Sequence, residues 1–223
     1  MDIKLFLQAI IKYVLGVLIV CGLLFIPANS FDYWNGWLFM GLLFIPMFLA
    51  GIILMIKNPE LLRKRLNAKE QENEQKWVLL FSGLMFIAGF IVAGLNHRYK
   101  WIEMPNAVTI ISSIIFIIAY ILYAEVLREN TYLSRTIEVQ ENQKVIDTGL
   151  YGIVRHPMYA TTILLFLTMP LVLGSIISFI IFLIYPFIIG KRINNEEKIL
   201  EKNLKGYTEY KKKVKYKVIP FVW

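Results

Sequence analysis

The longest stretch without a charged residue runs from Met158 to Gly190 and reads MYATTILLFLTMPLVLGSIISFIIFLIYPFIIG. As one α-helix its 33 residues would extend about 50 Å, well beyond the ~30 Å hydrocarbon core of a bilayer. Its centre contains Pro170 and Gly174, which interrupt helices. The stretch therefore predicts a helical hairpin, with a short first arm over Tyr159–Met169 and a second arm from Ser175 onward.

Four further uncharged stretches have the length of membrane-crossing helices. The chain has 223 residues, of which 57% are hydrophobic, and a mean hydropathy of +0.58, which is too apolar for a soluble globular domain. The four stretches are Val14–Phe31, Tyr33–Ile56, Trp77–Asn96 and Ala107–Ala124. Together with the hairpin they predict an all-α integral membrane protein with about six transmembrane helices, the last two forming the hairpin.

The distribution of Lys and Arg predicts how these helices are oriented. If the crossings alternate, the N-terminal tail and the segments 57–76, 128–157 and 191–223 share one side, and they carry 22 of the 24 cations. Cytoplasmic segments of membrane proteins are enriched in Lys and Arg. We therefore expect a multi-pass protein with both termini cytoplasmic, which would lie in the cell (inner) membrane if the host is prokaryotic. The net charge of +8 then requires no nucleic-acid partner.

The basic C-terminal tail has two compatible interpretations. Five lysines between residues 211 and 217 interleave with aromatic and β-branched residues such as Tyr210, Val214 and Tyr216. Such a segment can lie on anionic lipid headgroups, so membrane lipids are expected partners. It can also fold back over a site.

Two polar clusters flank the predicted hairpin. Before it stands Arg-His-Pro at 155–157, where Pro157 suits the first position of a helix and His156 is expected to cap that helix. After it, Arg192 and Glu196 are four residues apart and share a helix face, which by itself is also typical of a surface salt bridge. Because a hairpin returns the chain to the same side of the membrane, we expect the two clusters to meet.

Several common kinds of site are not indicated. The chain has two histidines, and His97 and His156 are expected on opposite sides of the membrane, so no metal site is predicted. A single cysteine, Cys21, excludes a disulfide framework. No Gly-x-Gly-x-x-Gly motif is present, so a Rossmann nucleotide fold is not indicated. The chain divides into N-terminal transmembrane helices, residues 1–127, and a polar-rich core region, residues 128–223.

Three ordered motifs carry a resemblance to a known family: GLYGIVRHPMY from Gly149 to Tyr159, the pair Glu196-Glu197, and a tail with GYTEY at 206–210 and YKVIP at 216–220. Together they resemble the isoprenylcysteine carboxyl methyltransferase (ICMT) family, of the bacterial or archaeal membrane type, over residues 128–223. That family is similar to phospholipid N-methyltransferases and uses S-adenosylmethionine (SAM) in an all-helical membrane protein. The resemblance implies a SAM-dependent methyltransferase with a cytoplasmic C-terminal cofactor-binding region.

The resemblance also implies roles for individual residues. Arg192 matches the position that pairs with the substrate carboxylate, and Glu196 would complete the cofactor pocket. Arg192, Glu196 and Tyr159 are therefore the expected catalytic residues. The expected cofactor contacts are Gln140, Gln143, Lys144, Val145, Ile146, Tyr151, His156, Pro157, Met158, Tyr159 and Glu196.

An arginine at the acceptor position favours a carboxylate over an amine as the methyl acceptor. A carboxylate with a pKa of about 3.5 is already ionised at neutral pH and needs only a cation to orient it. An amine would need a proton acceptor, for which Tyr159, Glu196 and His156 are available. We expect carboxyl O-methylation of a lipophilic, isoprenylcysteine-like or prenylated acceptor that enters from the bilayer. The alternatives are a phospholipid or other lipid N-methyltransferase, and a non-catalytic or reductase-like membrane relative.

Overall fold

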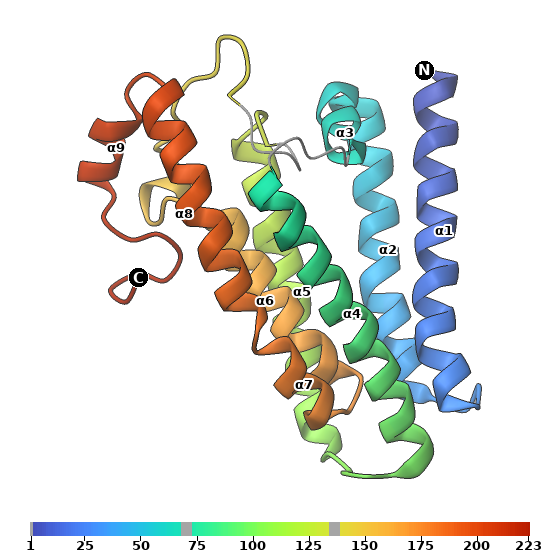
Figure 1. Cartoon of the computed structure of the whole chain (residues 1–223). Coiled ribbons are helices and arrows are strands. Elements are labelled where there is room, and N and C mark those ends of the chain that lie inside the picture. The colour runs from blue at the N-terminus through green and yellow to red at the C-terminus, as the bar shows by residue number, and fades with distance from the viewer. Residues whose placement is uncertain (1, 68–72, 134–138) are drawn as a thin grey trace.

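The computed structural model describes residues 2–67, 73–133 and 139–223, and within these residues it is helical without any β-strand (Figure 1). In chain order the elements are α1 (Ile3–Ala28), α2 (Trp34–Lys57), α3 (Pro59–Leu66), α4 (Asn73–Tyr99), α5 (Asn106–Glu129), the 3-10 turn η1 (Gly149–Gly152), α6 (Pro157–Val172), α7 (Ile176–Phe182), α8 (Tyr185–Asn203) and α9 (Tyr207–Lys213).

The long helices identify an integral, multi-pass membrane protein. Helices α1, α2, α4 and α5 are each long and apolar enough to cross a membrane, and so is the stretch Ile176–Asn203, which contains α7 and α8. Their outward faces carry large apolar side chains such as Ile11, Ile121 and Phe187, which suit contact with lipid. At 16 residues, α6 is shorter, about 24 Å long, so the predicted count of six crossings remains a prediction.

The predicted hairpin is formed by α6 and α7–α8. The chain turns at Gly174, whose φ of 73° lies in the left-handed region that favours glycine. Ser175 then caps α7, because its hydroxyl accepts a hydrogen bond from the Ser178 amide at 3.2 Å. Pro170 does not end the first arm, which continues to Val172. The Tyr33 hydroxyl holds the turn by donating to the Leu173 carbonyl at 2.7 Å.

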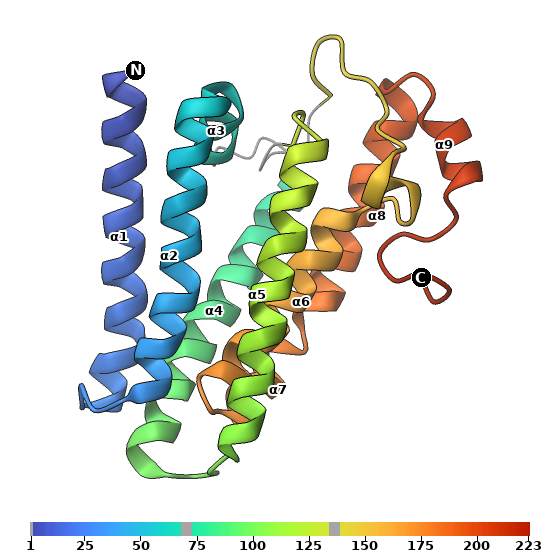
Figure 2. The same ribbon diagram turned by 180° about the vertical axis from the view of Figure 1, so that it is seen from behind.

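The two arms pack into the bundle through different neighbours. Helix α6 lies along α5, and the two run side by side in Figure 2. Helix α7 packs against α4, where the Phe182 ring sits over the bare backbone of Gly89. Aromatic side chains including Phe39, Phe90 and Phe116 fill the core between the elements. The first half of the chain thus supplies the wall on which the hairpin rests.

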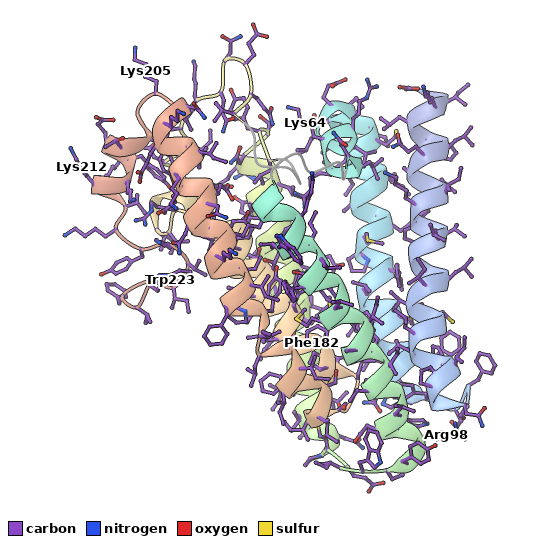
Figure 3. All side chains as sticks on the ribbon, viewed as in Figure 1. Lys64, Arg98, Phe182, Lys205, Lys212 and Trp223 are labelled. Carbon is purple, nitrogen blue, oxygen red and sulfur yellow. The ribbon has the colours of Figure 1, made fainter. Side chains whose placement is uncertain are left out.

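The labelled cationic side chains are distributed unequally between the two ends of the helix bundle. Lys64, Lys205 and Lys212 lie toward the end that holds the N-terminus, α3 and α9, whereas Arg98 lies at the opposite end (Figure 3). The turns that join α1 to α2, α4 to α5 and α6 to α7 gather at that opposite end (Figure 1). This arrangement has the alternation that the cation distribution predicts. Which end faces the cytoplasm remains a prediction.

Candidate active site

A cavity of about 90 Å³ lies where the predicted polar clusters meet. Its wall is built by residues 130–133 and 143–146, η1, the start of α6, the middle and end of α8, and α9. Most residues expected at the site from the sequence line it: Gln143, Lys144, Val145, Ile146, Tyr151, His156, Met158, Tyr159, Arg192 and Glu196. The fold therefore brings together residues that are separated by more than 40 positions in the chain.

Three of these residues form a chain of hydrogen bonds across the cavity wall. Arg192 Nε donates to the Tyr159 hydroxyl at 2.9 Å, and that hydroxyl donates to Glu196 Oε2 at 2.5 Å. The one-turn spacing of Arg192 and Glu196 on α8 lets both reach Tyr159, which lies in the first turn of α6. Arg192 and Tyr159 are buried. These hydrogen bonds therefore link a cation, a phenol and a carboxylate, in that order, at the cavity.

A second polar group is centred on the buried carboxylate of Glu197. Arg155 Nε donates to Glu197 Oε1 at 2.8 Å, and His156 Nε2 lies 3.2 Å from the same oxygen. Lys211 and Lys217 lie 3.5 and 3.7 Å from Oε2. A buried carboxylate is tolerated only when it is paired and hydrogen-bonded, and here cations from three segments satisfy it. Glu197 thereby fixes α8 relative to the start of α6.

His156 occupies the residue position before α6, as expected, but its imidazole does not cap the helix. Its φ of −126° and ψ of 61° are not helical, as the following Pro157 requires, and its side chain accepts no hydrogen bond from the first helical amides. The imidazole instead faces Glu197 on α8.

The C-terminal tail folds back over these residues. The Arg155 guanidinium donates to the carbonyls of Val214 and Lys215, each at 2.7 Å. The amides of Arg155 and His156 donate to the carbonyls of residues 216 and 217 at 2.9 and 2.8 Å. Beyond this point Trp223 lies against Gly190 of α8, and Figure 3 shows it beside that helix. The tail is therefore part of the wall that backs the cavity, as the second interpretation of its sequence suggested.

The described residues contain no group of three or more His, Cys, Asp or Glu side chains that could hold a metal ion. With this geometry established, comparison with known proteins identifies the region. Residues 109–202 match the isoprenylcysteine carboxyl methyltransferase (ICMT) family. The resemblance, which the motifs predict for residues 128–223, is thus confirmed up to residue 202, and the match begins earlier, at residue 109 within α5. The ICMT match excludes helices α1 to α4 and the tail motifs beyond residue 202.

A relative of different named activity is also similar to part of this chain. A Delta(14)-sterol reductase, TM7SF2, of Mus musculus is 26% identical over 91 residues, which are 40% of this chain and 22% of the reductase. The chain thus matches about a fifth of that relative's length.

Two residues expected as cofactor contacts in the ICMT-like region do not line the cavity. Gln140 bonds instead to α3 and to its own segment, since its Oε1 accepts from Lys64 Nζ at 2.5 Å and its Nε2 donates to the Tyr132 carbonyl at 2.7 Å. Pro157 is buried as the first residue of α6. Their cofactor roles, like those of the residues that line the cavity, stay predictions.

Sequence reasoning gave no site role to Arg155, Tyr207 and Tyr210, which line the same cavity, or to Glu197 behind it. Two features of the sequence could have indicated these residues. All four lie inside the three motifs, and Tyr207 and Tyr210 are three residues apart, so they share one face of a helix. Burial raises the pKa of both phenols, so they are protonated at neutral pH.

Proposed function

We propose that this protein is a SAM-dependent methyltransferase that esterifies the carboxylate of a lipophilic acceptor. The observation that carries the proposal is the chain from Arg192 through Tyr159 to Glu196 at one cavity, inside the region that matches the ICMT family. A cation for an acceptor carboxylate and a carboxylate for a cationic cofactor are thus within one helical turn of each other.

The donor set of the cavity fits a ligand like SAM in chemistry. Glu196 offers a carboxylate for an ammonium group, Lys144 offers a cation for a carboxylate, and Tyr151 and Met158 offer apolar surface for a ring system. At about 90 Å³ the cavity is smaller than the roughly 300–1,000 Å³ of common ligand pockets, so side chains at the wall must move to admit the ligand. When bound, SAM supplies an electrophilic methyl group.

The residues of the chain supply orientation and charge. An acceptor carboxylate is ionised at neutral pH and needs no general base. The Arg192 guanidinium orients it, and the Tyr159 hydroxyl holds that guanidinium in place. Burial of these groups strengthens their interactions with a charged acceptor, because the local dielectric is low. We place the site on the cytoplasmic face, with both termini on that side, on the basis of the cation distribution.

Two other functions have specific support. A lipid N-methyltransferase would use the same cofactor, with Tyr159, Glu196 or His156 accepting the proton of an amine. A reductase-like function on a lipophilic substrate is supported by the similarity to the sterol reductase over 91 residues. The arginine at the acceptor position favours the carboxyl methyltransferase over the lipid N-methyltransferase, and the ICMT family match favours it over the reductase-like function.

The test is binding followed by transfer. Purified protein in detergent should bind SAM and its demethylated product in calorimetry, and it should move labelled methyl from SAM to a prenylcysteine analogue but not to phosphatidylethanolamine. Transfer to phosphatidylethanolamine alone would establish the N-methyltransferase instead. Absence of SAM binding at millimolar concentration would remove both methyltransferase readings and leave the reductase-like function.

A further inference from the structure

Helix α9 presents two buried tyrosines to the cavity, and their hydroxyls differ in hydrogen bonding. Tyr210 donates to the Tyr151 carbonyl at 2.7 Å. The Tyr207 hydroxyl is buried and has no hydrogen-bond partner among the residues that the structure describes. The two rings are neighbours, with centroids 5.8 Å apart, and both line the cavity.

An unpaired buried hydroxyl is uncommon, because such a group loses its hydrogen bonds to water without replacement. Within the described part of the chain only one other buried side-chain atom is in this condition, Asn195 Nδ2, and Asn195 does not line the cavity. Tyr207, by contrast, lines the cavity and carries a buried hydroxyl without a hydrogen-bond partner among the described residues. It marks a position where a ligand can supply the missing partner.

We propose that the Tyr207 hydroxyl donates a hydrogen bond to the carboxylate at the amino-acid end of the cofactor. The inference rests on the proposed function, which assigns the ammonium of that end to Glu196. In an α-amino acid the ammonium and the carboxylate are attached to the same carbon, so a donor for one must lie close to the partner of the other. Tyr207 and Glu196 line the same cavity, and the Glu196 charge acts on the Tyr207 phenol.

The protonation state of Tyr207 suits a donor. Burial, together with the nearby carboxylates of Glu197 and Glu196, raises the pKa of this phenol. It therefore keeps its proton at neutral pH and offers a carboxylate an O–H without a charge of its own. Arg155 also lines the cavity, but its guanidinium already donates to Glu197 and to two carbonyls of the tail. Lys144 is the competing candidate for the same carboxylate.

The deciding variant is Tyr207→Phe, which removes only the hydroxyl. Calorimetry in detergent with S-adenosylhomocysteine should show a dissociation constant raised roughly 10- to 100-fold, as expected for a hydrogen bond to a charged group. The dissociation constant for 5′-methylthioadenosine, which lacks the amino-acid group, should be unchanged. The ligand-free variant should melt no lower than wild type, because an unsatisfied buried hydroxyl has been removed.

Tyr210→Phe is the matched control. It should lower the melting temperature of the ligand-free protein, because the Tyr151 carbonyl loses its donor, and it should change the affinity for the two nucleosides equally. The proposal is overturned if Tyr207→Phe leaves S-adenosylhomocysteine binding intact, if both nucleosides weaken alike, or if only Lys144→Met gives the selective loss. If wild type binds neither nucleoside, the proposed function itself fails, and this role fails with it.

Discussion

The two parts of the molecule bury different kinds of residue. In the described residues before 130, the buried polar side chains are neutral, namely Asn96, Thr109 and Ser112. Beyond residue 139, buried Arg155, His156, Arg192 and Glu197 are ionisable, and all four lie at or next to one cavity. Burying charged groups in a membrane protein is costly, and among the described residues the buried Arg, His and Glu side chains are confined to the C-terminal part of the chain. We call the described residues before 130 the packing region and those from 139 onward the chemical region.

The family match begins about 20 residues before the boundary between these two regions. The match begins at residue 109 and therefore includes α5, an apolar helix whose role is to pack along α6. Helices α1 to α4 lie outside the match and supply apolar walls, such as the Gly89 surface under Phe182. Helix α5 packs along α6, the helix that presents Tyr159.

The largest effect on stability is expected at the buried Arg155–Glu197 pair. Arg155→Met leaves the Glu197 carboxylate without its shortest partner and removes the donors to two tail carbonyls. Loss of one partner of a buried pair costs about 3–5 kcal/mol. Thermal unfolding in detergent should show this, and trypsin should cut the tail at its lysines sooner. Arg128→Met, which breaks an exposed pair with Glu125, is the control and should change little.

The double variant Arg155→Met with Glu197→Gln sharpens the interpretation. Because it removes both charges, it should recover part of the loss, as buried pairs replaced together often do. If Arg155→Met unfolds no sooner than Arg128→Met, the buried charges do not hold the chemical region together.

The next effect is on activity and concerns Arg192. Arg192→Ala should cost about 2–4 kcal/mol of transition-state stabilisation, or roughly 30- to 1,000-fold in rate on a carboxylate acceptor. SAM affinity should change much less, whereas Glu196→Ala should weaken SAM itself. Arg192→Lys should recover only part of the rate, since an ammonium cannot reproduce the guanidinium fork. Steady-state kinetics with labelled SAM measures all three.

The exposed neighbour Lys191 provides the matched control for Arg192. Lys191→Ala removes a cation from the same helix but from its exposed face, so the rate should stay near that of wild type. Full activity of Arg192→Ala on every carboxylate acceptor would move the lipid N-methyltransferase ahead of the proposed function.

How far the sequence predicts this molecule depends on the range of each interaction. The hairpin follows from the length of the uncharged stretch and from Gly174 within it, and the place of His156 follows from the proline after it. Both are local effects. The pairing of Arg155 with Glu197 spans 42 positions and depends on how α6 meets α8, which no local pattern encodes.

The tail is a second case in which the sequence was insufficient. Its lysines are equally suited to lipid headgroups, whereas its docking on residues 155 and 156 uses main-chain hydrogen bonds that leave no signature in side chains. Tyr207 and Gln140 could not be placed relative to the cavity in advance either, because their positions depend on contacts between segments that are distant in the chain. Motif membership predicted which residues gather, and only the three-dimensional arrangement distinguishes the wall from what lies behind it.

In the packing region the expected effects are smaller and steric. Gly89→Ala puts a methyl group against the Phe182 ring of α7, and overpacking of this kind costs about 1–3 kcal/mol. Gly83→Ala on the same helix meets no atom within 4 Å and should be neutral or gain up to about 1 kcal/mol in helix propensity. Thermal unfolding compares the two, and equal melting temperatures would contradict the close packing of α4 on α7. SAM affinity should be unchanged in both.

The smallest effect is expected where charge in the chemical region is exposed. Asp147 lies just after the 143–146 wall segment, and its carboxylate accepts a hydrogen bond from Lys213 of α9 at 2.7 Å. That bond lowers the pKa of Asp147, so the pair stabilises the folded protein above the ordinary aspartate pKa of about 3.9 and is lost as the pH falls through the lower folded value. Asp147→Asn should therefore melt slightly below wild type at neutral pH and low salt. The difference should vanish in acid, and also in high salt, which screens exposed charges. A loss of ligand affinity in Asp147→Asn as large as that in Tyr207→Phe would mean that this exposed pair, and not the buried groups, sets the position of the cavity wall.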